Sequence, residues 1–257
     1  FKSIWRITFP ILVALVMEEL LGMTDTAFLG RVGEIELGAS AIAGVYFTIL
    51  YMLGFGFSIG VQIIIGRRNG EACESGTGFG AIGRVFWQGV WFLAALALLT
   101  MVLSYLLSPP LLRGILKSEN IYEAALVYVN WRIPGLLFAI MTALFRAFYV
   151  GICETKSLTW NSIVLVGSNI FLDWVLIFGH LGAPAMGIKG AALASTISEG
   201  ISLLFFVVWA FFTADKKYGL RKMVKPVWKE LKHVFSTASW VMLEYVLNIS
   251  VWLLFFL

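Results

Sequence analysis

Charged residues are scarce in this sequence. Only 13% of its 257 residues are Asp, Glu, Lys or Arg, whereas 60% are hydrophobic and the mean hydropathy is +0.90. A soluble domain usually carries about 25% charged residues, so the composition excludes an ordinary soluble protein. It predicts an all-α, polytopic helical membrane protein whose surroundings are the lipid bilayer.

Cysteine and histidine are also nearly absent. Cys73 and Cys153 make no CxxC pair, and His180 and His233 lack the spacing of metal ligands. The sequence has no HExxH motif and no nucleophile elbow. These absences argue against an enzyme and against a resident metal or cofactor. The net charge of +4 does not indicate nucleic-acid binding, because the basic residues gather between apolar segments.

Long apolar runs are what the sequence has in abundance. Seven segments are long enough, at about 20 residues, to span a membrane. They are residues 7–29, 39–65, 86–108, 127–152, 159–179, 190–213 and 234–257. In the second of them, Gly56 and Gly60 are spaced for close helix packing. Lys and Arg concentrate in the loops on the side of the N-terminus, which predicts a cytoplasmic N-terminus.

The seventh segment repeats a feature of the first. Glu18 lies eight residues after Pro10, and Glu244 lies eight residues after Ser236. A repeat that begins again after six helices is typical of a two-lobed transporter.

This repeat divides the chain into three parts. We predict an N-terminal lobe of six helices over residues 1–213, a basic inter-lobe linker over 214–233 and the first helix of a second lobe over 234–257. The linker is expected to lie along the membrane surface as a helix, or to be a positively charged loop. Because the chain begins at Phe1 and stops at Leu257 within an apolar run, we expect it to be a fragment that lacks most of the second lobe.

Three carboxylates interrupt the first apolar segment, namely Glu18, Glu19 and Asp25. A charged side chain at the bilayer centre costs roughly 2.5–3.5 kcal/mol on insertion scales, so such residues are candidates for function. Glu18 and Asp25 are seven residues apart and therefore share one helix face. Glu19 points about 100° away and has no assigned role.

Four polar residues fall at similar depth, in the half of the bundle away from the N-terminus. They are Asp25, Asn169, Asp173 and Thr196. Together they could hold a proton or a Na⁺ ion, because hard cations prefer oxygen ligands and because burial and mutual repulsion favour protonated carboxyl groups. The alternative is structural: the acids could cap neighbouring helices, and the amide and hydroxyl could hold helices together.

A second set of acids lies nearer the middle of the membrane. We predict that Glu18, Glu199 and Glu244 face a substrate cavity, which would then be acidic. Arg132 and Arg146 are expected to reach lipid phosphates at the two ends of their segment instead of the cavity.

With these residues in place, the sequence resembles the multidrug and toxic compound extrusion (MATE) transporters. The resemblance rests on blocks that occur in order along nearly the whole chain. The blocks are residues 24–33 (TDTAFLGRVG), 38–44 (GASAIAG), 66–71 (GRRNGE), 145–156 (FRAFYVGICETK), 169–173 (NIFLD) and 187–196 (GIKGAALAST).

The resemblance implies about twelve helices in two six-helix lobes around a central cavity, so the C-terminal lobe of the same protein would be the missing partner. It implies a location in the plasma membrane (the inner membrane of a bacterium). It also implies export of drugs, organic cations and other amphipathic compounds by antiport with H⁺ or Na⁺.

The resemblance also carries residue roles. The ion site of the family's first lobe matches Asp25, Asn169, Asp173 and Thr196, and Glu244 matches an acid found in one subgroup. The position of Glu18 is often Gln in relatives, so an acid there would add a protonatable site or favour cationic substrates.

Two other functions fit part of the pattern. A lipid-linked oligosaccharide or polysaccharide flippase of the same superfamily would need a more basic cavity than the acidic one predicted here. A seven-helix receptor or photoreceptor is suggested by the number of apolar segments. A retinal protein needs a lysine in its last helix, however, and no lysine follows Lys232.

Overall fold

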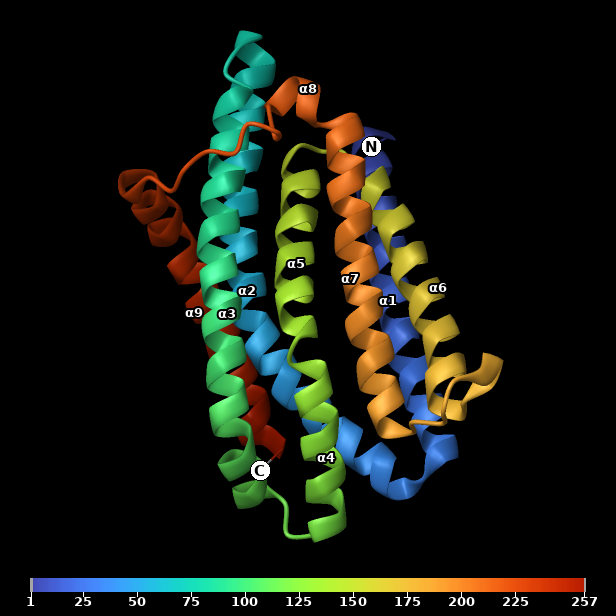
Figure 1. The fold of residues 1–257 in the computed structure, drawn as a ribbon. Helices are drawn as coiled ribbons and strands as arrows, with labels where there is room; N and C mark the ends of the chain where they lie inside the picture. Colours follow the sequence, from blue (N-terminus) through green and yellow to red (C-terminus); the bar gives the residue numbers. More distant parts are fainter. Residues whose placement is uncertain (1, 257) are drawn as a thin grey trace.

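The fold is a bundle of long helices that run roughly along one direction (Figure 1). The structure, a computed structural model, describes the backbone of residues 2–256 and the side chains of these residues except 2–4, 6, 7, 246 and 249–256. Residues 1 and 257, the outermost of the expected first and third parts, lie outside the described residues. The elements are α1 (Lys2–Val32), α2 (Glu34–Ser75), α3 (Gly80–Ile115), α4 (Glu119–Arg132), α5 (Gly135–Gly151), α6 (Lys156–Phe178), the 3₁₀ turn η1 (His180–Gly182), α7 (Ile188–Thr213), α8 (Asp215–Tyr218) and α9 (Trp228–Phe256).

Several helices are long and apolar enough to cross a membrane. These are α2, α3, α6 and α7, and α4 and α5 form a further span together although they are bent by 51° at their junction. Each predicted apolar segment coincides, to within one residue at its ends, with part of a helix or with the bent pair. A helix satisfies its own backbone hydrogen bonds, which lipid cannot do, and this explains why the apolar runs fold as helices.

The bend between α4 and α5 lies at Pro134, which has no N–H to donate to the carbonyl one turn earlier. That carbonyl, on Asn130, accepts a hydrogen bond from the Tyr105 hydroxyl of α3 (3.3 Å). The next carbonyl, on Trp131, accepts from the Thr196 hydroxyl of α7 (3.0 Å). Side chains of neighbouring helices therefore replace the helical bonds lost at the bend.

The connection between α7 and α9 is mostly non-helical. α8 is a single turn that ends at Gly219, whose φ is +68°, and α9 begins at Trp228, soon after Pro226. Residues 228–233 of the expected linker therefore belong to α9. The structure thus differs from the expected surface helix, because a left-handed glycine ends α8 and a proline precedes the next helix.

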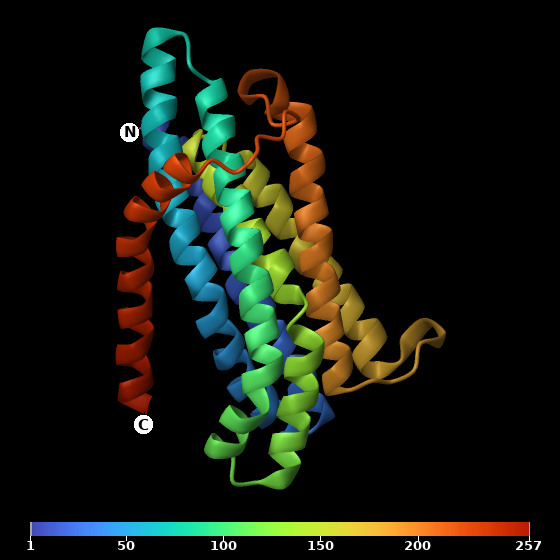
Figure 2. The same cartoon turned by 60° about the vertical axis from the view of Figure 1, so that its left-hand side comes forward.

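The helices pack in a definite order. α1, α6 and α7 lie side by side, and α9 lies at the edge of the bundle against α2 and α3 (Figure 1, Figure 2). α2 meets α9 at Gly56 and Gly60, where a Cβ atom would lie 3.0 Å from Met242 Cα and 2.4 Å from Ala238 Cα, respectively. The close packing predicted for these two glycines is confirmed.

Candidate functional site

The acids of α1 and α6 meet near the end of the bundle that is opposite the N-terminus. Asp25 of α1 is half-buried, whereas Asn169 and Asp173 of α6 are fully buried. Asn169 and Asp173 are four residues apart and so lie on one face of their helix, toward α1 and α7. We call Asp25, Asn169, Asp173 and the nearby Ser195 of α7 the acid cluster.

Asn169 connects the two carboxyl groups of the cluster. The amide of Asn169 is assigned with its nitrogen toward the acids, because its oxygen would otherwise face only other acceptors. In this orientation Asn169 Nδ2 donates to Asp25 Oδ1 (2.8 Å) and to Asp173 Oδ2 (3.2 Å). The other end of the amide lies 3.4 Å from the Ser195 hydroxyl oxygen. Among the described residues, Asp173 Oδ1 is buried and has no hydrogen-bond partner. The cluster therefore holds an unsatisfied acceptor beside a second acid, which is costly unless a proton or a cation joins it.

Thr196 occupies a different place from the one expected. Its hydroxyl donates to the Trp131 carbonyl at the bend between α4 and α5, and Ser195 is the α7 hydroxyl that reaches the amide of Asn169. Neighbouring residues of a helix point about 100° apart, so only one of the two can face the acids. The run Ser195-Thr196 offered both hydroxyls, and which of them faces the acids depends on the rotation of α7.

A polar cavity of about 360 Å³ lies between α1, α2, α4, α5, α6 and α7. Glu18 and Glu199 line it, as the sequence predicted, but so do Arg132 and Arg146. The remaining lining residues are Leu21, Phe47, Thr48, Tyr51, Met52, Ala139, Thr142, Leu165 and Ser202. The expectation that both arginines reach the membrane surface is wrong.

Arg132 forms a two-point ion pair with Glu199. Arg132 Nη1 and Nη2 donate to the two carboxylate oxygens of Glu199 at 2.7 and 2.5 Å. The guanidinium carbon lies 3.9 Å from the centre of the Phe47 ring, and the side chains of Arg132 and Glu199 are only 12% and 15% exposed. Planar guanidinium suits both the fork-like pairing and the aromatic contact, so this pair is firmly held.

Arg146 pairs with Glu18 across the same cavity. This pair is more open, with the side chains 19% and 32% exposed. Each cavity glutamate is therefore matched by an arginine, and the cavity is charge-balanced instead of acidic. A sequence signal existed: two arginines lie within one apolar segment, and a buried charge requires a partner.

The remaining acids singled out in the sequence lie apart from the acid cluster and from the polar cavity. Glu244 of α9 is exposed and is not among the residues that line the polar cavity. Glu19 is also exposed, on another face of α1 from Glu18. Within the described part of the chain, no group of three or more His, Cys, Asp or Glu side chains could hold a metal ion.

The acid cluster and the cavity are joined by one segment of α7. Ser195, which contacts the cluster, and Glu199, which lines the cavity, are four residues apart and lie on one helix face. The arrangement can bind a proton or a small cation at one place and an amphipathic molecule at the other, with α7 in contact with both.

Comparison with known proteins agrees with this architecture. Residues 10–175 match the MatE family. The chain is 28% identical over 246 residues to a probable multidrug resistance protein NorM of Idiomarina loihiensis, covering 91% of this chain and 50% of the relative. It is 26% identical over 245 residues to a probable multidrug resistance protein NorM of Thermotoga maritima, covering 91% of this chain and 49% of the relative.

Solved structures share the fold. An outward-facing multidrug resistance MATE transporter superposes with a TM-score of 0.83 at 20% identity, over 95% of this chain and 52% of that chain. A Pyrococcus furiosus transporter of the MOP superfamily gives a TM-score of 0.82 at 20% identity over the same 95% and 52%.

The prediction of an all-α, multi-pass membrane protein is confirmed. The chain spans about half the length of the relatives it matches, which corresponds to one lobe, and it belongs to the MatE family of multidrug and toxic compound extrusion transporters.

Proposed function

We propose that the chain is the first half of a secondary active transporter that exports drugs or organic cations in exchange for H⁺ or Na⁺. The observation that carries this proposal is the acid cluster, in which Asn169 bridges Asp25 and the fully buried Asp173. The transporter lies in the plasma membrane with its N-terminus in the cytoplasm, and it works with a second lobe that faces the polar cavity.

In this scheme the coupling ion and the drug stabilise different conformations of the transporter, so each disfavours binding of the other. Binding of a proton or Na⁺ to the acid cluster favours one orientation of the lobe, and binding of substrate in the cavity favours the other. The segment from Ser195 to Glu199 provides a physical connection, because its two ends contact the two sites. Substrate and ion then influence each other without touching.

The orientation of the Asn169 amide bears on which ion is used. With its nitrogen toward the acids, Asn169 offers N–H donors to both carboxyl groups. A Na⁺ ion between the acids would instead need the amide oxygen to turn toward it. The two orientations of this amide therefore suit different coupling ions, which separate pH and Na⁺ gradients distinguish.

The test is export of a fluorescent organic cation by vesicles that carry the full-length protein, with pH and Na⁺ gradients imposed separately. Asp25→Asn and Asp173→Asn should each abolish export while membrane insertion stays normal. Glu119→Gln, at an exposed acid paired with Arg113, is the matched control and should leave export unchanged. Undiminished export by the two Asn variants would contradict the assignment of the ion site.

A flippase of lipid-linked oligosaccharides is the second candidate. An acidic cavity would disfavour this function, but Arg132 and Arg146 line the cavity alongside the acids. Arginine binds diphosphate groups well. If vesicles fail to export any organic cation but move a lipid-linked sugar diphosphate across the membrane, this second candidate replaces the first.

A further inference from the structure

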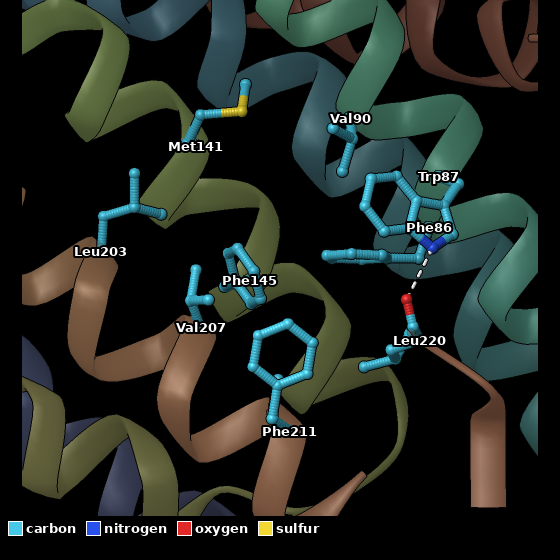
Figure 3. Close-up of a pocket in the computed structure, with 10 residues that line it drawn as sticks. Phe86, Trp87, Val90, Met141, Phe145, Leu203, Val207, Phe211 and Leu220 are labelled. Carbon is cyan, nitrogen blue, oxygen red and sulfur yellow. Dashed lines mark hydrogen bonds between the residues drawn. The ribbon is translucent and has the colours of Figure 1, made fainter. Parts of the chain in front are cut away.

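A second hollow lies on the bundle, between α3 and α7 and over α5. Six of the residues that line it are Phe86, Val90, Phe145, Leu203, Val207 and Phe211 (Figure 3). Its volume is about 240 Å³, and its lining side chains are apolar. We call it the α3–α7 groove.

The groove is separate from the polar cavity. On α5, Arg146 lines the cavity whereas its neighbour Phe145 lines the groove. On α7, Ser202 lines the cavity whereas Leu203 lines the groove. The two hollows therefore lie on different sides of the same helices, and a molecule in the groove does not enter the proposed transport site.

The linker after α8 is fixed at one end of the groove. The indole N–H of Trp87 donates to the Leu220 carbonyl (2.9 Å), as Figure 3 shows, and the indole N–H of Trp91 donates to the Val224 carbonyl (2.9 Å). Leu220 itself contributes to the groove lining. Gln88 of α3 adds two more hydrogen bonds, donating to the Lys225 carbonyl (3.1 Å) and accepting from the Val227 N–H (3.0 Å), so α3 holds the linker where the groove ends.

This linker brings positive charge to the apolar groove. The guanidinium carbon of Arg221 lies 5.6 Å from the centre of the Phe211 ring, which lines the groove. Lys222 and Lys225 follow on the same linker and are exposed. Asp215 pairs with Arg221 (3.2 Å) and offsets part of its charge, but Lys222 and Lys225 keep this stretch of the linker positively charged.

We propose that the α3–α7 groove binds an acidic phospholipid. One acyl chain would lie against Phe145, Val207 and Phe211, and the phosphate would contact Arg221 and Lys222. An apolar surface and a basic cluster occur side by side at the end of membrane-spanning helices, which is the combination that a phospholipid with a net negative headgroup requires. A zwitterionic phospholipid would gain the same apolar contacts but less from the basic side chains.

Photo-crosslinking of the purified full-length protein tests this assignment. The probes are phosphatidylglycerol and phosphatidylcholine, each with a diazirine on its acyl chain, and mass spectrometry locates the labelled peptides. We expect phosphatidylglycerol to label α3 and α7 peptides at the groove more strongly than phosphatidylcholine does. Equal labelling by the two lipids would overturn the proposal.

Matched variants test the basic residues and the apolar groove of the proposed site separately. Arg221→Gln with Lys222→Gln should lower labelling by phosphatidylglycerol about five-fold for each charge removed and leave phosphatidylcholine unaffected, whereas Arg221→Lys should retain most of it. Val207→Trp should block both lipids from the groove. The controls are Leu204→Trp, on the same helix and 62% exposed outside the groove, and Arg67→Gln, an exposed arginine paired with Glu71. Loss of labelling in the controls, or its persistence in Val207→Trp, would contradict the proposed site.

Discussion

Ser195 and Thr196 show how adjacent hydroxyls on one helix acquire different roles. Ser195 lies beside the amide that bridges the two acids, whereas Thr196 supplies a donor to a carbonyl freed by the helix bend. One belongs to a site where an ion is proposed to bind, and the other holds two helices together. The difference arises from the 100° step between neighbouring helical residues.

Alanine substitutions at these two positions should therefore affect different properties, thermal stability for Thr196 and the pH dependence of export for Ser195. Thr196→Ala removes one interhelical hydrogen bond, which is worth about 0.6–1.7 kcal/mol in a membrane, and should lower the thermal stability of the detergent-solubilised protein. Ser195→Ala should leave thermal stability nearly unchanged and shift the pH at which export is half-maximal. A pH shift in Thr196→Ala but not in Ser195→Ala would reverse the assignment.

The pair between Glu18 and Arg146 allows a second prediction. Either Glu18→Gln or Arg146→Gln leaves a charge without its partner, and each should destabilise the protein by about 2 kcal/mol. The double variant removes both charges and should be more stable than the sum of the single effects implies. Thermal unfolding of the four proteins in detergent measures this coupling, and strict additivity would mean that the two side chains do not interact.

At the scale of helices, the positions of the apolar spans could be predicted from the sequence, but their ends and bends could not. A run of apolar residues must be helical in lipid, and so each predicted segment coincides with a helix or the bent pair. The bend at Pro134 depends on Tyr105 and Thr196, which donate to its free carbonyls from other helices. No local pattern contains that information.

Contact between α2 and α9 gives a prediction at this scale. Gly60→Ala places a Cβ atom 2.4 Å from Ala238 Cα, whereas a Cβ at Gly44 meets nothing within 4 Å. Gly60→Ala should therefore cost about 1–3 kcal/mol by overpacking and separate α9 from α2, while Gly44→Ala should be neutral or stabilising. Thermal unfolding and proteolysis within the 219–227 linker compare the two, and similar behaviour would contradict the observed contact.

At the scale of the molecule, the proposed orientation in the membrane rests on where the basic loops lie. The N-terminus, the α2–α3 turn and α8 lie at one end of the bundle, and the α3–α4 and α6–α7 connections lie at the other (Figure 1). Cys73 and Cys153, near the ends of α2 and α5, are both free and exposed. The two native thiols therefore report on the end that is proposed to be cytoplasmic.

Thiol labelling tests this orientation directly. A membrane-impermeant maleimide should label both cysteines in inverted vesicles and neither in right-side-out vesicles, because the reagent reaches only the outer face of each. A cysteine placed at Lys117, between α3 and α4, in a protein with Cys73→Ser and Cys153→Ser should show the reverse pattern. Labelling of the native cysteines in right-side-out vesicles would place the N-terminus outside.

Composition and spacing alone determined that this is an all-α membrane protein and that Asp25, Asn169 and Asp173 share one depth. These two properties follow from hydropathy and from the regular rise of a helix, whereas the resemblance to the MATE family rests on its sequence blocks. Tertiary structure alone decided that Ser195 and not Thr196 faces the acids. It also paired both cavity acids with arginines and left Glu244 apart. Each of these depends on how one helix is rotated and packed against another, and ion pairing across the bundle joins residues as far apart in sequence as Glu18 and Arg146.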